Sequence, residues 1–420
     1  MSDKNLVLAS DGTSLKRSLA RSLKRQKIRA LLLIAPLLLF VLLTFIAPIA
    51  DMLFRSVENS IVADTLPQTV KELASWDSDS GQLPSEAVYA ALARDLKIAV
   101  KAKNHTKLGS RLNYQKTGTS SLFRQTGRKI KKLDFENTPS FKDAFEKMNK
   151  KWSDPAVWQT IQQFSNKYTD GYFLAAADLT RTSSGIEEVP EDQRIYYTLL
   201  LRTLSMSVTI TFMCILLGYP VAFLLATLPL RSSNVLMILV LLPFWTSLLV
   251  RTSAWKVLLQ NQGVINDFLV WIGIVADGNR LELINNVTGT VIAMTHILLP
   301  FMILPLFSVM KTIPPTYMRA AKSMGANDFT AFRRVYFPQS IPGIGAGSIL
   351  VFILSIGYYI TPEIVGGTKG VFISNRIAYH ISSSLNWGLG AALGAILLVV
   401  VLALYWLYDK FVGIDNVKLG

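Results

Sequence analysis

The sequence predicts an all-α membrane protein that crosses the bilayer six times and carries a large, mainly helical extracytoplasmic insertion after its first span. The composition is the first observation behind this prediction: 51% of the 420 residues are hydrophobic and only 17% are charged, with a mean hydropathy of +0.36. The second is that the apolar residues fall in six long runs, each close to the roughly 20 residues with which a helix spans the hydrocarbon core. The third is a long polar segment between the first and second runs.

Residues 1–30 are expected to form a cytoplasmic basic tail. The basic residues that precede the first apolar run are Lys16, Arg17, Arg21, Lys24, Arg25, Lys27 and Arg29. By the positive-inside rule they keep the N-terminus in the cytoplasm. The run itself, 31–50, is longer than the roughly 7 to 15 apolar residues of a cleaved signal peptide, so we expect an uncleaved transmembrane helix. The net charge of +15 is not accompanied by an aromatic-interleaved basic patch, so nucleic acid is not an expected partner.

Residues 51–195 are expected to form an extracytoplasmic inserted domain that is mainly helical. Apolar residues recur there at helical spacing, at Phe141, Phe145, Met148 and Trp152, and the preceding Pro139 and Ser140 suit a helix start. The segment 104–133 is rich in Lys, Arg, Thr, Ser and Gly without a clear period, which favours a loop. The three histidines, His105, His296 and His380, are far apart in sequence and are expected to be ordinary polar residues.

The remaining runs predict a five-helix core over 196–413, followed by a cytoplasmic tail at 414–420. The five spans are expected at 199–228, 234–254, 289–310, 343–362 and 389–408. The single cysteine, Cys214, lies within a span and is expected to be packing filler. From a cytoplasmic N-terminus, both positively charged connections, the short one at Arg231 and the longer one at 312–340, lie in the cytoplasm, as does the C-terminus.

The cytoplasmic loop 312–340 predicts two short helices joined at a glycine. Pro315 suits a first helical position, Gly325 a positive φ, and Asn327 the start of the next helix. Pro338 is expected to end that second helix. Its apolar side contains Phe329, Phe332, Val335 and Tyr336, opposite Arg333 and Arg334, and such an amphipathic element is suited to dock on a soluble partner.

This loop resembles the EAA loop of the permease subunits of ATP-binding-cassette (ABC) importers. Ala320, Ala321, Gly325 and Pro338 match the family pattern, Val335 and Phe337 replace its Ile and Leu, and Arg319 occupies its glutamate position. The resemblance implies the type I ABC importer permease fold, in which this loop contacts a separate ATPase. The coupling residues that it implies are Arg319, Ala320, Ala321, Gly325, Val335, Phe337 and Pro338, with the charge of the contact left open by Arg319.

The resemblance extends from about Tyr197 to the C-terminus and is similar in detail to the spermidine/putrescine branch. Three stretches carry it: 242–255, 263–266 and 357–367. It implies a non-enzymatic subunit that moves a small solute, a polyamine such as spermidine or putrescine, across the bacterial inner membrane. The partners that it implies are ABC ATPase subunits, a second permease and a periplasmic solute-binding protein. Permeases for opines, amino-acid-like solutes or iron share parts of the pattern, so these solutes stay open.

The outer ends of the third and fifth spans carry the candidate translocation path. Aromatic faces and a carboxylate stabilise an ammonium group, and the residues that supply them are Trp245, Trp255, Tyr358, Tyr359 and Glu363. Arg251 is expected to pair with Glu363. An aromatic belt at the membrane interface would explain the same tryptophans and tyrosines.

Three features decide against other classes of protein. The chain has no G-x-x-x-x-G-K-[S/T] motif, so no cofactor is expected in it and ATP is expected on the partner ATPase. A secondary transporter would require ion-coupling carboxylates in mid-membrane, which the spans lack. A membrane-anchored receptor that acts through the insertion would not explain the spacing of the cytoplasmic loop.

Overall fold

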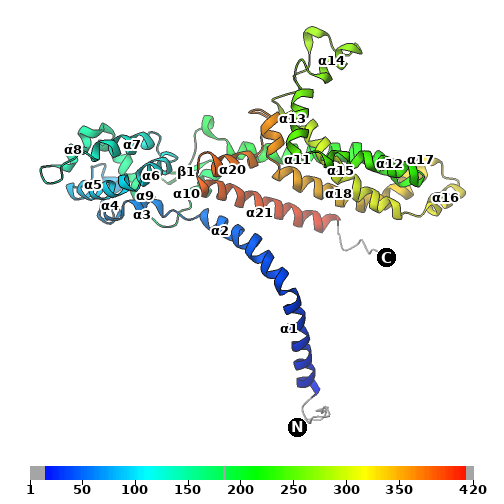
Figure 1. Cartoon of the computed structure of the whole chain (residues 1–420), viewed down its shortest axis with the longest axis horizontal. Helices are drawn as coiled ribbons and strands as arrows, with labels where there is room; N and C mark the ends of the chain where they lie inside the picture. Colours follow the sequence, from blue (N-terminus) through cyan, green and yellow to red (C-terminus); the bar gives the residue numbers. More distant parts are fainter. Residues whose placement is uncertain (1–14, 183–184, 413–420) are drawn as a thin grey trace. The chain divides into compact units, whose positions relative to one another are not determined.

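The computed structural model describes residues 15–182 and 185–412 (Figure 1). The chain divides into two compact units, and the boundary lies between Arg55 and Ser56. The expected N-terminal tail lies partly, and the expected tail at 414–420 entirely, outside the described residues.

The first unit is a long apolar helix. It consists of α1 (Leu15–Val41), a π-helical turn (Leu42–Ile46) and α2 (Ala47–Arg55), and the stretch Ser22–Arg55 is long and apolar enough to cross a membrane. Its large side chains are exposed, Leu33 by 83%. A helix that is apolar on every side requires lipid or another protein around it.

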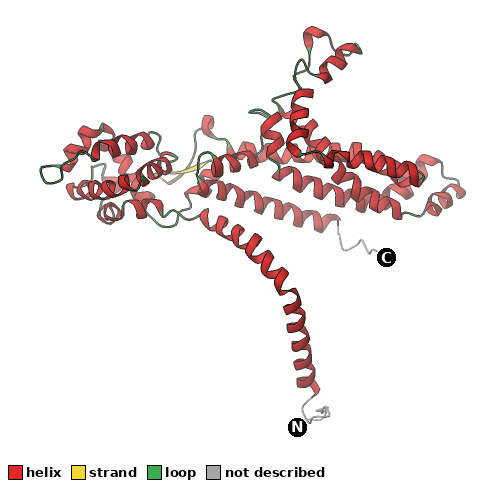
Figure 2. Cartoon of the chain, viewed as in Figure 1, coloured by secondary structure: helices red, strands yellow, loops and turns green. Residues whose placement is uncertain are grey.

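The second unit begins with the insertion, in which helices are the main regular structure (Figure 2). Its helices are α3 (Ile61–Thr65), α4 (Pro67–Leu73), α5 (Glu86–Lys101), α6 (Asn104–Asn113), α7 (Thr119–Ile130), α8 (Phe141–Met148), α9 (Pro155–Gln163) and α10 (Gly171–Ala176). The mainly helical content expected for this segment is confirmed, and Ser140 caps α8 by accepting a hydrogen bond from the Asp143 backbone N–H.

An aromatic cluster forms the hydrophobic core of the insertion. Trp152 and Trp158 are fully buried, with ring centroids 5.3 Å apart, and Phe145 and Tyr89 contact them edge-on. Their polar atoms are satisfied internally: the Trp152 Nε1 donates to Thr126 Oγ1 at 2.9 Å, and Tyr89 Oη and Trp158 Nε1 donate to the Trp152 carbonyl at 3.0 Å. Buried indole and phenol groups that find such partners add specificity to the apolar packing.

The loop expected at 104–133 is wrong, because this segment forms α6 and α7. Five apolar residues in it are fully buried: Leu108, Leu112, Leu122, Phe123 and Ile130. They are spaced for two short helices, but Gly118, at φ +96°, separates them and interrupts the helical period. A turn of this kind divides one amphipathic hairpin into two segments too short for the period to be clear.

A short hairpin and a buried aspartate connect the insertion to the membrane core. Strands β1 (Leu179–Thr182) and β2 (Gly185–Glu188) are antiparallel, with Leu179 opposite Glu188. Next to them Asp178, 5% exposed, accepts hydrogen bonds from the backbone N–H groups of Ile195, Tyr196 and Tyr197. N–H groups at the start of a helix have no acceptor within the helix, and here the Asp178 carboxylate provides one. Its negative charge also stabilises the positive end of the α11 dipole.

The core contains α11 (Tyr196–Thr227), α15 (Val287–Thr312) and α18 (Phe337–Gly357) packed side by side. The other helices are α12 (Leu230–Leu241), α13 (Leu248–Leu258), α14 (Val264–Trp271), α16 (Pro315–Ser323), α17 (Asp328–Ala331), α19 (Ile360–Val365), α20 (Ile373–Ser382) and α21 (Trp387–Val412). Cys214 is fully buried between α11 and α15, where its thiol contacts the Thr295 carbonyl.

Five helices of the described chain are long and apolar enough to span a membrane, and a bent pair is the sixth candidate. The span expected at 234–254 is not one continuous helix: α12 with its terminal 3₁₀ turn (Leu242–Trp245) meets α13 at 96°. Pro243 lies in that turn, Thr246 is extended, and the Ser247 hydroxyl caps α13 by accepting from the Val250 N–H. A cap within an apolar run ends one helix and starts another without a change in hydropathy.

Pro338 was expected to end the second loop helix, and this is wrong. The helix continues from Asp328 to Gly357 through a π-helical turn at Phe332–Tyr336. A π-helical turn also ends two residues before Pro48 in the first unit. A proline cannot donate to the carbonyl four residues before it and its ring crowds that carbonyl, so a wider turn before the proline lets the helix proceed.

The insertion contacts the core through α20 and α21. The Tyr172 ring lies so close to Gly388 that any side chain there would collide with it, and Tyr114 Oη donates to the Ser384 carbonyl. His380 is buried in the same region between the Tyr196 hydroxyl, at 2.9 Å, and the Ser384 hydroxyl, at 3.0 Å. Burial, and secondarily the charge of Arg376, lowers the pKa of His380 to about 4, so this imidazole is neutral at neutral pH.

Candidate functional site

The loop after α15 forms a rigid helix–turn–helix around Gly325. The Gly325 N–H donates to the Lys322 carbonyl at 2.9 Å and the Ala326 N–H to the Ala321 carbonyl at 3.1 Å, which is a Schellman ending of α16. Gly325 has a φ of +90°, as its place in this ending requires. The Asn327 side chain then caps α17 by accepting from the Thr330 N–H at 2.8 Å. The roles expected of Gly325 and Asn327 in the local structure are confirmed.

The tip of this loop exposes large apolar side chains. Met324 is 83% exposed, Phe329 69% and Tyr317 50%. Around them Arg319, Arg333 and Arg334 are exposed, while Lys322 forms an ion pair with Asp328. Ala320 is exposed and Ala321 is buried against the loop itself. Such an apolar tip within a charged rim has the anatomy of a protein–protein contact.

Aromatic stacking connects the loop to the membrane core. Phe332 stacks on Tyr336 at 5.9 Å, and both contact Phe223 of α11 edge-on, at 5.8 and 5.2 Å. Phe337, which is 39% exposed, contacts the Tyr219 ring at 5.8 Å, and Tyr219 is hydrogen-bonded to Ser340 at 2.9 Å.

Two other predicted coupling residues lie on the same helix. Val335 is half-buried, its carbonyl accepts from the Gln339 side chain, and Pro338 begins the part of the helix after the π turn. The loop therefore packs directly against α11 and is continuous with α18.

Arg251 holds the bend between α12 and α13. Its guanidinium donates to the carbonyls of Pro243 and Thr246, the latter at 3.0 Å, and approaches Thr246 Oγ1 at 3.4 Å. The Pro243 carbonyl also accepts from the Thr246 N–H at 3.3 Å and from the Thr246 hydroxyl at 2.8 Å, so the arginine adds a charged donor to an acceptor that is already paired. It also satisfies the Thr246 carbonyl beside the break. It also places a cation at the negative end of the α12 dipole.

Glu363 has a different partner, so the expected Arg251–Glu363 pair is wrong for this conformation. Its Oε2 accepts from Asn375 Nδ2 at 2.6 Å, and the same amide group donates to the Tyr359 carbonyl at 2.9 Å. Among the ion pairs of the described residues none joins the two groups. Sequence alone could not reveal that backbone carbonyls freed by the bend compete for the arginine.

The aromatic candidates surround the same region with different degrees of exposure. Trp245 is 73% and Tyr359 46% exposed, whereas Tyr358 and Trp255 are half-buried. Trp255 Nε1 donates to His296 Nδ1 at 3.0 Å, which connects α13 to α15. Arg251 lies within electrostatic range of Tyr358.

Four residues that sequence reasoning did not assign to this site complete it. Thr252 and Thr361, both fully buried, are hydrogen-bonded at 3.1 Å and join α13 to α19, His296 accepts from Trp255, and Asn375 orients Glu363. A polar residue within an apolar run is the only signal that could have indicated Thr252.

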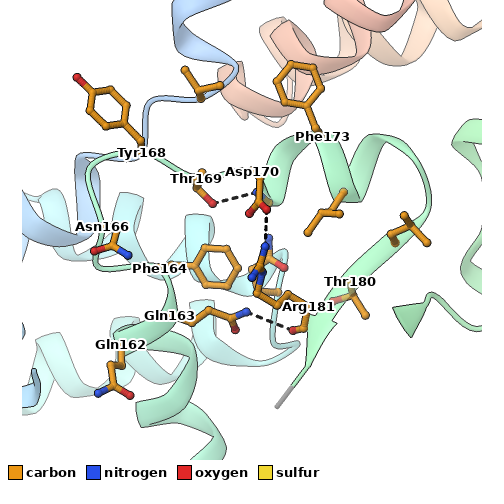
Figure 3. A pocket seen from close by; sticks show the side chains of 15 residues that line it. Gln162, Gln163, Phe164, Asn166, Tyr168, Thr169, Asp170, Phe173, Thr180 and Arg181 are labelled. Carbon is orange, nitrogen blue, oxygen red and sulfur yellow. Dashed lines mark hydrogen bonds and ion pairs between the residues drawn. The ribbon is translucent and has the colours of Figure 1, made fainter. Parts of the chain in front are cut away.

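A separate pocket of about 660 Å³ lies in the insertion between α9, α10 and β1 (Figure 3). Asp170 and Arg181 face each other across it as an ion pair, and Gln163 Nε2 donates to the Arg181 carbonyl. Because the two charges neutralise each other, the pocket presents little net charge to a ligand.

Comparison with known families decides what the core is. Residues 196–412 match the family model described as "Binding-protein-dependent transport system inner membrane component". The chain belongs to this family. The match begins and ends with α11 and α21, so it contains both the loop at Gly325 and the site at Arg251, whereas helices α3–α10 lie outside it.

Several curated proteins are similar to about half of this chain. The spermidine/putrescine transport system permease PotB of Escherichia coli K12 is 34% identical over 215 residues, which is 50% of this chain and 78% of PotB. The inner membrane ABC transporter permease YdcU of the same organism is 33% identical over 229 residues, covering 52% of this chain and 72% of YdcU. Among solved structures, a bacterial alginate ABC transporter bound to its periplasmic protein is 18% identical, with a TM-score of 0.42 over 55% of this chain and 82% of that one.

Proposed function

We propose that this protein is a permease subunit of an ABC importer that moves a polyamine such as spermidine or putrescine across the bacterial inner membrane. The observation that carries the proposal is that 215 residues of this chain are 34% identical to spermidine/putrescine permeases. Permeases for other solutes are alternatives, since a molybdenum transport permease of Mycobacterium bovis is 29% identical over 208 residues.

The chemistry of the outer site supports a cationic solute. Exposed Trp245 and Tyr359, with half-buried Tyr358 and Trp255, offer aromatic faces that stabilise an ammonium group by about 0.5 to 2 kcal/mol each. Glu363 supplies a carboxylate whose only hydrogen-bond donor among the described residues is the neutral Asn375 amide, so its negative charge stays available. The Arg251 guanidinium donates hydrogen bonds to two backbone carbonyls, and these interactions limit its repulsion of a cation.

The loop at Gly325 supports coupling to a separate ATPase that binds the ATP. Its apolar tip and arginines form the contact, and the stacking of Phe332 and Tyr336 on Phe223 transmits ATPase closure to the spans. Arg319, in place of the family glutamate, makes the contact more basic, so we infer an acidic partner groove. The spans then alternate between inward-facing and outward-facing states.

The proposed assembly contains ABC ATPase subunits, a second permease and a periplasmic binding protein in the lipid bilayer. Both termini lie in the cytoplasm, and residues 51–195 lie outside the membrane, where a binding protein arrives. The positive loops at Arg231 and 312–340 support this orientation.

A solute-binding assay tests the substrate class. The periplasmic binding protein encoded beside this permease should bind spermidine or putrescine by titration calorimetry, with competition between the two polyamines and none from alginate, molybdate or histidine. Exclusive binding of a neutral or anionic solute would leave an ABC permease but refute the polyamine assignment.

A further inference from the structure

One end of the insertion concentrates positive charge to a degree that the rest of the insertion does not. Residues 97–132 contain eleven lysines and arginines and no aspartate or glutamate. Nine of the eleven are exposed, and none of these nine forms an ion pair within the ranges that the structure describes. The two others are Arg111, which is buried, and Lys116, which pairs with Asp154.

The fold brings these residues together at the junction of three helices. Val100 of α5, His105 of α6 and Gly127 of α7 meet so closely that a Cβ on Gly127 would stand 2.4 Å from the His105 ring and 3.2 Å from Val100. The residues within a few positions of this contact form what we call the basic end: Lys101, Lys103, Lys107, Arg128, Lys131 and Lys132. Asp134, the first acid after the run, lies near Lys97 and does not belong to this group.

Helix stability accounts for only part of this charge. Lys101, Arg128 and Lys131 lie at the C-terminal ends of α5 and α7, where cations complement the helix dipoles. Lys103 and Lys107 lie at the N-terminal end of α6, where the dipole disfavours them, and the first turn of α6 has no acid. Lys103 also adopts a left-handed φ of +58°, which is uncommon for a side chain of its size. Local folding does not explain these two lysines.

The basic end faces away from the membrane core. At the other end of α6, Arg111 Nε donates to the Tyr172 hydroxyl at 2.8 Å and Tyr114 donates to Ser384 of the core. The ten residues of α6 extend about 15 Å at 1.5 Å per residue, so Lys103 lies at the end of the helix remote from these contacts, and Lys107 lies one turn before Arg111. The bilayer surrounds the core, so this position favours a soluble partner over lipid headgroups.

An exposed apolar residue completes the surface. Ile98, one turn before Lys101 on α5, is 64% exposed. An apolar side chain ringed by charges of one sign is suited to a protein contact in which the apolar residue is buried and the charges steer association.

We propose that the basic end, with Ile98, is a docking surface for an acidic face of a soluble protein, the periplasmic binding protein of the same transport system. This inference rests on the proposed function, because it needs the insertion outside the membrane and a binding protein as partner. The insertion then increases the rate and the lifetime of the encounter before solute reaches the site at Arg251. Lysines and arginines that are screened by salt give such docking a steep dependence on ionic strength.

The test uses the full-length chain, assembled with its partner permease and ATPase in phosphatidylcholine nanodiscs, and the binding protein in solution. The variant Lys101→Glu/Lys107→Glu/Lys131→Glu should weaken binding at least tenfold in biolayer interferometry, mainly through the association rate. The matched control reverses three exposed lysines elsewhere on the insertion, Lys71→Glu/Lys147→Glu/Lys150→Glu, and should stay within threefold of the wild type. Wild-type affinity should fall about tenfold between low and physiological salt, and that of the first variant much less.

A milder set, Lys101→Gln/Lys107→Gln/Lys131→Gln, guards against misfolding and should weaken binding by an intermediate factor. Equal affinity of wild type and both basic-end variants would overturn the docking surface while leaving transport intact. If the basic-end variants bind the protein normally but lose association with phosphatidylglycerol vesicles, the surface binds lipid and the proposal is wrong. If the wild-type assembly does not bind the protein at all, the transport function proposed above is wrong as well.

Discussion

Replacing Gly325 by valine should disconnect this permease from its ATPase. Gly325 has a φ of +90°, and a Cβ there would meet no atom within 4 Å, so the penalty comes from the backbone alone. A left-handed conformation costs an L-residue about 1 to 2 kcal/mol, and a β-branched one more. If α16 must end in this turn in order to dock, the population of the competent loop falls by roughly five- to thirtyfold. Solute-stimulated ATP hydrolysis and uptake in proteoliposomes should fall by a similar factor.

The chain provides a matched control for this substitution. Gly273 has a φ of +77°, also has free space around a Cβ, and ends α14 with the same pair of backbone hydrogen bonds, to Val270 and Leu269. Gly273→Val therefore imposes a similar strain outside the loop and should leave ATP hydrolysis coupled. Gly325→Asn, which tolerates a positive φ, should retain most of the activity. Unchanged stimulated ATP hydrolysis and uptake in Gly325→Val would refute the role assigned to this loop.

Four further predictions follow from the contacts described above. Glu363→Gln and Arg251→Gln should have additive effects on polyamine uptake, because the two groups have separate partners, and a coupling above about 1 kcal/mol in the double variant would contradict this. Asp178→Ala should lower the free energy of unfolding of the detergent-solubilised protein by about 1 to 2 kcal/mol, since three helix N–H groups lose their acceptor. Asp178→Asn should lower this free energy by less. The folded-state pKa of His380 is about 4, below the usual 6.5, so the unfolded state binds more protons than the folded state between these two pH values. The free energy of unfolding should therefore decrease as the pH falls through this window, by at most about 1.4 kcal/mol per pH unit. His380→Gln should abolish this pH dependence. Ser121→Cys should react with a membrane-impermeant maleimide in intact spheroplasts against a low background, because Cys214 is buried, and labelling only after permeabilisation would contradict the topology.

Local signals in the sequence predicted much of the loop at Gly325. Glycine, asparagine and proline each have a conformational or capping preference that acts within a few residues, so the turn, the cap of α17 and the first residue of α16 could be predicted. The continuation of the helix through Pro338 was not predicted, because a proline more often ends a helix than lets it continue, and the π-helical turn that accommodates it has no signal of its own in the sequence. The same limit applies to Pro48 in the first unit.

The outer site was predicted less well, since its contacts join segments far apart in the chain. Hydropathy cannot distinguish a straight span from two helices at 96°, because the capping Ser247 lies among apolar residues. The bend presents the carbonyls of Pro243 and Thr246 to Arg251, and α20 brings Asn375 to Glu363. These partners are consequences of tertiary structure. The helices α6 and α7 were missed for a related reason: each is short, and its burial comes from the aromatic core of the insertion.

Uptake of labelled spermidine tests the central claim most directly. The complex of this chain with its partner permease and ATPase is reconstituted in proteoliposomes with the binding protein outside and ATP inside. We predict that spermidine accumulates and that its accumulation requires both ATP and the binding protein. Putrescine should reduce the accumulation by competition, and an ATPase variant unable to hydrolyse ATP should abolish it. Accumulation that proceeds without ATP in response to an ion gradient, or ATP-dependent uptake of another solute that spermidine does not inhibit, would contradict the account.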